Sequence, residues 1–250
     1  LSRREHLRVV EITLEEAAGR IAVLAGCGGY NTAEVIDLGK ELATMGVDGL
    51  LSVTPYYNKP TQEGLYQHYK AIASAVPLPI VVYSVQGRTG VNVEPATVRR
   101  LAEIENIVGI KEASGNIAQI ASILRQVPER FVVLSGDDAV TLALIALGGR
   151  GVISVVSNQI PAEMTRMVHL CLNNEFPAAR RLFYKYLPLM EVNFIESNPI
   201  PVKAAMAMMG LLEPVWRLPL TPPRAESLVR IERVLADLGL VEARPTHAAS

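Results

Sequence analysis

The chain has 250 residues, of which 50% are hydrophobic, 20% charged and only 5% aromatic, and its 24 basic and 25 acidic side chains give a net charge of -1. This is the composition of an ordinary globular protein, and single α/β barrels commonly reach about this length. The balanced charge lacks the basic footprint of a nucleic-acid binder, and no cationic amphipathic stretch indicates a membrane surface. We therefore predict neither a nucleic-acid partner nor a membrane partner.

The two cysteines, Cys27 and Cys171, lie far apart and belong to no CxxC or Cys/His cluster. Neither a disulfide framework nor a structural zinc site is predicted from them. No apolar run reaches the roughly 18 residues of a membrane span, and residues 1–11 lack the hydrophobic stretch of a signal peptide. A reducing, cytoplasmic location is expected. The first residue is Leu1 rather than Met, which leaves open whether the sequence begins inside a longer chain.

Six short apolar runs bounded by Gly, Pro or Asn predict β-strands at 21–27, 49–55, 79–85, 107–113, 131–137 and 151–157. They are continuous rather than alternating, which is typical of strands covered on both faces in a parallel sheet. Helical spacing fills the intervals, at 2–18, 32–45, 61–75, 95–104, 116–126 and 139–147. Strict alternation predicts a parallel α/β fold, and the pattern leaves open whether it is a doubly wound sheet or a (β/α) barrel.

Helical segments alone follow the sixth strand, at 161–173, 175–194, 201–209 and 221–238. We therefore predict a (β/α) segment over 1–158 and a C-terminal helical appendage over 159–243. Residues 244–250 are expected to form a frayed tail.

Lys111 stands near the end of the fourth predicted strand, and ligand-binding side chains in parallel sheets gather at the C-terminal ends of strands. Burial there would lower the pKa of its amine from about 10.4 towards neutrality, leaving a free amine that can attack a carbonyl and form a Schiff base. Lys111 is the leading candidate nucleophile. The alternative is that it caps the strand and reaches solvent or pairs with Glu112.

Tyr83 lies near the end of the third predicted strand, and Arg88 lies in the turn after it. If the third and fourth strands are neighbours, the Tyr83 phenol reaches the same edge as Lys111 and can donate and accept protons, while Arg88 can hold a carboxylate by two hydrogen bonds. The alternatives are a core tyrosine with its hydroxyl at the edge and a solvated turn arginine.

The other motifs indicate a function less directly. Tyr56 and Tyr57 are adjacent aromatics in a rigid loop, which suggests a site or an interface. Helix capping accounts for Asp137 and Asp138 after the fifth strand. No GxGxxG, Walker or GxSxG pattern is present, and the four histidines share no metal-ligand spacing. We expect no metal and no cofactor.

Four segments together resemble the dihydrodipicolinate synthase family, within the pyruvate-dependent aldolases that include N-acetylneuraminate lyase. They are VTPYYNKPTQEGLYQHY at 53–69, YSVQGRTG at 83–90, GIKEASGN at 109–116 and LSGDDA at 134–139. The segments at 151–158 and 198–206 extend the match over nearly the whole chain. The resemblance implies a (β/α) barrel of the TIM type and a lyase that condenses pyruvate with L-aspartate 4-semialdehyde, in the lysine and diaminopimelate pathway.

The resemblance also implies roles for individual residues. Lys111 would form the Schiff base with pyruvate, Tyr83 would relay protons, and Arg88 would hold the carboxylate of the semialdehyde. Tyr57 would reach across a dimer into the neighbouring site. The substrate-binding residues would further include Gly136 and Ile153, with the backbone around Ile153 lying along the bound pyruvate.

The chain departs from the family pattern at its start. Family members carry about two further strands, with a Gly-Thr-Thr-Gly segment whose threonine links the two tyrosines, so the six strands imply an incomplete barrel. We expect a homo-oligomer, a dimer or tetramer, in which strand edges are paired or elements are swapped between copies, because an open barrel leaves edges unpaired. Three outcomes stay open: the named activity, reduced by the shortening; another aldehyde acceptor; and a noncatalytic homologue.

Further departures lie in two loops. Tyr30 stands where lysine-inhibited relatives typically carry asparagine, so feedback by lysine is doubtful, although Glu34, Tyr56 and His6 match that inhibitor site. Ser84 and the Gln-Gly pair at 86–87 replace the more common Asn and Pro-Ser and can alter the choice of acceptor.

Overall fold

The computed structural model describes residues 1–242, which form two compact units. The first unit comprises Leu1–Gly136 and Leu147–Gly151, and the second comprises Asp137–Ala146 and the described residues from Val152 onward. The tail predicted at 244–250 lies outside the described residues. The division of the chain into segments 1–158 and 159–243 stays a prediction.

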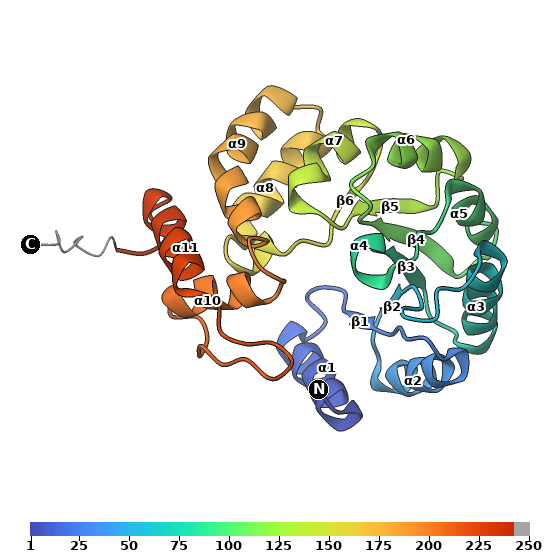
Figure 1. Cartoon of the computed structure of the whole chain (residues 1–250). Coiled ribbons are helices and arrows are strands. Elements are labelled where there is room, and N and C mark those ends of the chain that lie inside the picture. Colours follow the sequence, from blue (N-terminus) through green and yellow to red (C-terminus); the bar gives the residue numbers. More distant parts are fainter. Residues whose placement is uncertain (243–250) are drawn as a thin grey trace, which may run out of the picture. The chain divides into compact units, whose positions relative to one another are not determined.

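A parallel sheet carries the fold (Figure 1). Its strands are β1 Leu24–Gly26, β2 Gly49–Val53, β3 Ile80–Ser84, β4 Ile107–Glu112, β5 Val132–Ser135 and β6 Gly151–Val152, and they lie in chain order. The pairs from β1 to β5 are parallel throughout. The prediction of an α/β chain with six strands in a parallel sheet is confirmed.

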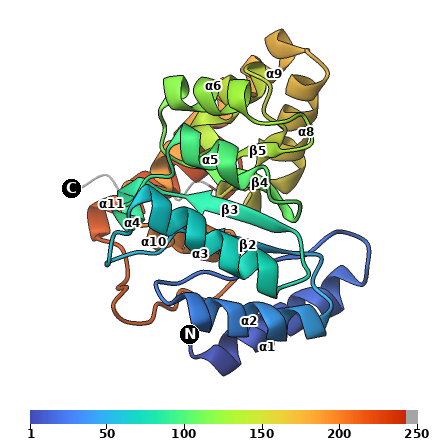
Figure 2. The ribbon, with the colours of Figure 1, turned by 90° about the vertical axis from the view of Figure 1, so that its right-hand side faces the viewer.

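Helices of the first unit connect these strands. They are α1 Arg3–Ala17, α2 Thr32–Met45, α3 Gln62–Ala75, α4 Gln86–Thr89, α5 Pro95–Leu101 and α6 Ile117–Gln126. Asn31, Thr61 and Asn116 cap α2, α3 and α6 by accepting hydrogen bonds from backbone N–H groups of the first turn. Figure 2 shows α3 and α5 on one face of β2, β3 and β4. Fully buried side chains such as Leu65 and Ile120 form the core between these layers.

The second unit is helical. It contains two short 3₁₀ turns, η1 Asp138–Val140 and η2 Val156–Asn158, and the helices α7 Thr141–Ala146, α8 Pro161–Leu172, α9 Phe176–Val192, α10 Ile200–Met208 and α11 Ala225–Asp237. Its core includes Met167, Leu189 and Leu235, each at most 1% exposed. Among the helices within residues 1–242, none is long and apolar enough to cross a membrane.

Asp137 and Asp138 behave differently. Asp137 caps η1 as predicted, because its Oδ1 accepts the Ala139 N–H at 2.9 Å. Asp138 is 1% exposed, and its Oδ2 instead accepts the N–H groups of Val155 and Val156 at 3.0 and 2.9 Å. Capping therefore explains only the first of the two carboxylates.

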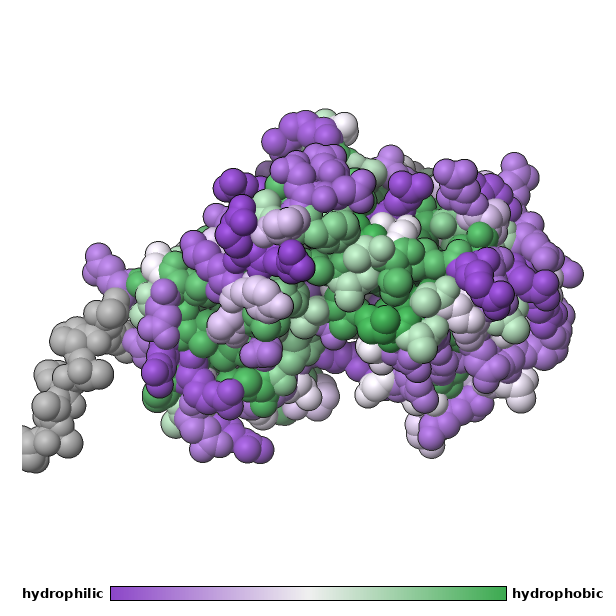
Figure 3. All heavy atoms as spheres, turned by 90° about the horizontal axis from the view of Figure 1, so that it is seen from above, coloured by the Kyte–Doolittle hydropathy of each residue, from purple (hydrophilic) through white to green (hydrophobic). Residues whose placement is uncertain are grey.

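Some large apolar side chains remain at the surface. In the first unit, Ile21 is 71% exposed, and Leu24, on the edge strand β1, is 44% exposed. The face of the molecule drawn in Figure 3 carries hydrophobic areas between hydrophilic ones. Such exposure is ordinary for single side chains, but it gains meaning where it coincides with an unpaired strand edge.

Candidate functional site

The first unit brings Lys111 and Tyr83 together. β3 and β4 are parallel neighbours, and Tyr83 stands opposite Lys111 in their register. Both side chains are partly buried, and the Lys111 Nζ lies 3.9 Å from the centroid of the Tyr83 ring. An amine over the face of a tyrosine ring is attracted by the ring quadrupole when it carries a proton, so this contact favours a cation formed on that nitrogen.

Arg88 lies on the short helix α4, directly after β3. Burial raises the pKa of the Tyr83 phenol above its usual value, and the positive charge of Arg88 opposes that shift. The phenol is therefore neutral near pH 7 and can donate a proton or accept one. Arg88 is exposed and its charge acts on Tyr83, so its guanidinium can meet a carboxylate that comes from solvent.

Gly136, just after β5, leaves the space through which the lysine side chain runs. A Cβ at this position would lie 2.6 Å from Ala113 Cβ, 3.1 Å from Lys111 Cε and 3.2 Å from Lys111 Cγ. The Gly136 N–H also donates to the Glu112 carbonyl at 2.7 Å. The glycine thus lies against Lys111, as a residue of the same site.

Glu112, the residue after Lys111, is hydrogen-bonded to a helix and to the loop after β4. Its carboxylate accepts hydrogen bonds from Gln119 Nε2 at 2.8 Å and from Ser114 N at 3.3 Å. Neither Gln119 nor its second partner, Asn92, was predicted to belong to the site. One feature of the sequence could have indicated these residues. A polar residue follows each of the two candidate catalytic residues within an apolar strand, Ser84 after Tyr83 and Glu112 after Lys111.

The two remaining predicted residues are Tyr57 and Ile153. Tyr57 is on the loop after β2, with a positive φ of 71° and a side chain that is 92% exposed. Ile153 follows β6 and belongs to the second unit, where it is partly buried. The assigned roles of all six residues stay predictions, and the first unit brings four of them, Lys111, Tyr83, Arg88 and Gly136, to the ends of β3, β4 and β5.

A model of the Dihydrodipicolinate synthetase family matches residues 1–238. The chain belongs to this family. It is 51% identical over 243 residues to the 4-hydroxy-tetrahydrodipicolinate synthase of Koribacter versatilis, covering 97% of this chain and 81% of that relative. The predicted membership of the family is therefore confirmed.

Solved structures of family members agree with the fold. The chloride-inhibited dihydrodipicolinate synthase of Acinetobacter baumannii, in complex with pyruvate, is 44% identical and superposes with a TM-score of 0.95 over 96% of this chain and 83% of that one. A monomeric dihydrodipicolinate synthase variant is 44% identical, with a TM-score of 0.92 over 94% of this chain and 79% of that one. These matches do not confirm the shortened barrel, which stays a prediction.

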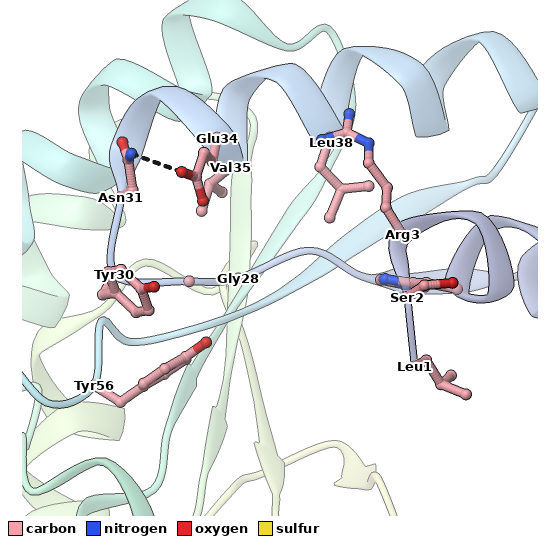
Figure 4. Close-up of a pocket in the computed structure, with 12 residues that line it drawn as sticks. Leu1, Ser2, Arg3, Gly28, Tyr30, Asn31, Glu34, Val35, Leu38 and Tyr56 are labelled. Carbon is pink, nitrogen blue, oxygen red and sulfur yellow. Dashed lines mark hydrogen bonds between the residues drawn. The ribbon is translucent and has the colours of Figure 1, made fainter.

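A pocket of about 530 Å³ lies between α1 and the N-terminus of α2 (Figure 4). It gathers the four residues compared with the lysine site of relatives: His6, Tyr30, Glu34 and Tyr56. The rings of Tyr30 and Tyr56 meet edge to face, with centroids 5.4 Å apart, and Asn31 Nδ2 donates to Glu34 Oε1 at 3.0 Å. Tyr30 therefore presents an aromatic ring to the pocket, and lysine feedback stays doubtful.

Proposed function

We propose that the chain condenses pyruvate with L-aspartate 4-semialdehyde through a Schiff base on Lys111. The observation that carries this proposal is the contact between the Lys111 amine and the Tyr83 ring, 3.9 Å apart, at the ends of adjacent strands in a member of the dihydrodipicolinate synthase family. The pyruvate complex of a relative with the same fold supports the first substrate. The name of the Koribacter versatilis relative, 4-hydroxy-tetrahydrodipicolinate synthase, supports the product of this condensation.

The chemistry begins with attack of the Lys111 amine on the ketone carbon of pyruvate. Water leaves, and the resulting iminium makes the methyl protons acidic because charge can spread into the C=N bond. Loss of one methyl proton gives an enamine, whose carbon attacks the aldehyde carbon and forms the new C–C bond while the C=O π bond breaks and its oxygen takes up a proton. The amino group of the semialdehyde then adds to the imine carbon and expels the Lys111 amine, which closes the ring and frees the lysine. We assign proton transfer at the nitrogen to the Tyr83 phenol, and the contact of its ring with Lys111 supports this assignment.

The other residues bind and orient the substrates. Arg88 holds the carboxylate of the semialdehyde, with its geometry suited to two parallel hydrogen bonds. Gly136 keeps the path of the lysine side chain open. The backbone at Ile153 lies along pyruvate, and Tyr57 acts from a second copy of the chain. The six strands are part of a (β/α) barrel of the TIM type that the helices after residue 158 complete and extend.

A different aldehyde is the second candidate acceptor. Ser84 and residues 86–87 change the loop that carries Arg88, which contacts the acceptor in this scheme. Comparing several short aldehydes with and without a carboxylate, at saturating pyruvate, separates the two cases. A strong preference for aspartate semialdehyde supports the first.

Trapping with borohydride tests the Schiff base directly. Incubation with pyruvate and borohydride should add a reduced pyruvyl group to Lys111, located by peptide mass analysis. Lys111→Ala should abolish the adduct, while Lys185→Ala, which changes a lysine on α9 that is not among the proposed site residues, should keep it. If the unmodified chain gives no adduct under conditions that label a relative, the Schiff-base mechanism is wrong. An adduct without condensation product would instead identify a noncatalytic homologue.

A further inference from the structure

A buried polar layer lies behind the pair formed by Lys111 and Tyr83. Successive strand residues point to opposite faces of a sheet, so Ser84 and Glu112, which follow the pair directly, point away from it. They stand opposite each other in the register of β3 and β4. Ser84 is 0% exposed and Glu112 is 1% exposed. Burying a carboxylate costs free energy unless hydrogen bonds satisfy it, so Glu112 needs hydrogen-bond donors in the interior.

The partners form a continuous path between the two strands. Glu112 Oε1 accepts from Gln119 Nε2 at 2.8 Å, and Gln119 exchanges two hydrogen bonds with Asn92, at 2.7 and 3.1 Å. Asn92 Oδ1 also accepts from the Ser84 hydroxyl at 3.4 Å, and Ser84 Oγ accepts from Val93 N at 3.1 Å. The path runs from β4 through α6 and the loop after α4 to β3.

We propose that Glu112, Gln119 and Asn92 are positioning residues that hold Lys111 against Tyr83. This inference rests on the proposed function, in which those two side chains perform the chemistry. Glu112 also accepts from Ser114 N at 3.3 Å, which ties the end of β4 to the loop that follows it. Fixing Glu112 and Ser84 on one face fixes the direction of the preceding Cα–Cβ bonds on the other face. Small displacements of reacting groups are costly in rate, which gives such a brace a catalytic effect.

The donors and acceptors of the path have a fixed direction. Glu112 can only accept, so Gln119 must offer it an N–H and offer its other N–H to Asn92. Glu112→Gln leaves one acceptor oxygen where the carboxylate has two, so its NH₂ group faces either the Ser114 N–H or the Gln119 NH₂. Gln119→Glu places two carboxylates together. The double exchange restores the contact between residues 112 and 119, since a glutamine at 112 donates to a glutamate at 119, which also accepts from Asn92 Nδ2. It does not replace the N–H that Asn92 Oδ1 accepts from Gln119 in the parent. It moves the negative charge from the strand to the helix.

The experiment compares both single variants, the double variant and Gln126→Glu, a control on the same helix whose side chain bonds to Ser122. For each we would measure kcat and KM, the rate of borohydride trapping with pyruvate, and the thermal unfolding midpoint. Each single exchange should lower kcat and the trapping rate by about tenfold or more, with KM changed less, at temperatures where the variant is fully folded. The double exchange should raise both rates about threefold or more above either single exchange, because it restores the contact between residues 112 and 119, and Gln126→Glu should match the parent.

Two results would overturn the proposal. Single variants that trap pyruvate at the parent rate would show that the path does not position Lys111. A double variant as slow as the singles, yet folded, would show that the hydrogen bond between residues 112 and 119 does not set the rate. If the parent chain itself fails to trap pyruvate, the proposed function fails first, and that outcome is seen before any variant is compared.

Discussion

Gly136 has no Cβ, and the site geometry depends on this absence. A Cβ there would lie 2.6 Å from Ala113 Cβ and 3.1 Å from Lys111 Cε. Distances this short force the lysine side chain or the strand to move. We therefore predict that Gly136→Ala slows trapping of pyruvate by about tenfold or more, since small misplacements cost large factors in rate. The cost in free energy of unfolding should be about 1–3 kcal/mol, typical of overpacking.

Gly26→Ala is the matched control for this prediction, because a Cβ at Gly26 meets nothing within 4 Å. It should leave the trapping rate unchanged. Parent-like trapping by Gly136→Ala would mean that Lys111 reaches pyruvate by a different path. Circular dichroism and the thermal midpoint would show whether slowed trapping reflects the site or a loss of folding.

The residues of the site were predictable to different degrees. Lys111 and Tyr83 could be paired from the sequence because parallel neighbouring strands bring their ends to one edge, and the structure places them opposite each other. Gln119 and Asn92 could not, since their meeting depends on how a helix and a loop pack over the sheet. Gln119, the partner of Glu112, lies on the face of the sheet opposite to the side chain of Lys111.

At the scale of elements, the contact between α2 and α3 includes a buried histidine. His68 is 6% exposed, and its Nδ1 lies 2.9 Å from the Thr32 hydroxyl at the start of α2. Burial lowers the pKa of His68 from 6.5 to about 4. His68 therefore becomes protonated near pH 6.5 in the unfolded chain but only near pH 4 in the folded chain. The free energy of unfolding falls as the pH drops from 6.5 towards 4, because protons bind preferentially to the unfolded state.

We predict a loss of about 2 kcal/mol from this residue between pH 7 and pH 5, from about 1.4 kcal/mol per pH unit. Denaturant unfolding of His68→Asn, which keeps a polar group near Thr32, should show a smaller loss over the same range. His169→Asn, at an exposed position on α8, should follow the parent. Equal pH dependence in the parent and His68→Asn would show that His68 is not the group that titrates.

Element boundaries show where local patterns failed. The sixth apolar run predicted a strand over 151–157, but β6 ends at Val152 and η2 begins at Val156. The cause lies 17 residues earlier, because the Asp138 carboxylate accepts the N–H groups of Val155 and Val156 and so turns the chain. The last helix begins at Ala225 rather than 221, after the two prolines at 222–223. Apolar runs predicted where each strand lies, whereas distant hydrogen bonds set where it ends.

At the scale of the whole molecule, the sheet leaves a strand edge. β1 is at one end of the strand order, and within residues 1–242 it pairs with β2 alone. One side of its backbone therefore lacks a strand partner, and Leu24 and Ile21 beside it are 44% and 71% exposed. Unpaired edges with apolar side chains favour pairing with another chain. Membership of the family does not decide the oligomeric state, since one solved relative is a monomeric variant.

We predict that the chain self-associates through this edge. Light scattering coupled to sizing should give at least twice the 27.1 kDa of one copy at micromolar concentration. Leu24→Lys should weaken association by about tenfold or more, because a lysine on an edge strand opposes pairing. Val229→Lys is the control, since Val229 is 66% exposed on α11, away from the edge strand in sequence. A stable 27.1 kDa species in the parent chain would contradict pairing between copies, and equal weakening by both variants would place the interface elsewhere.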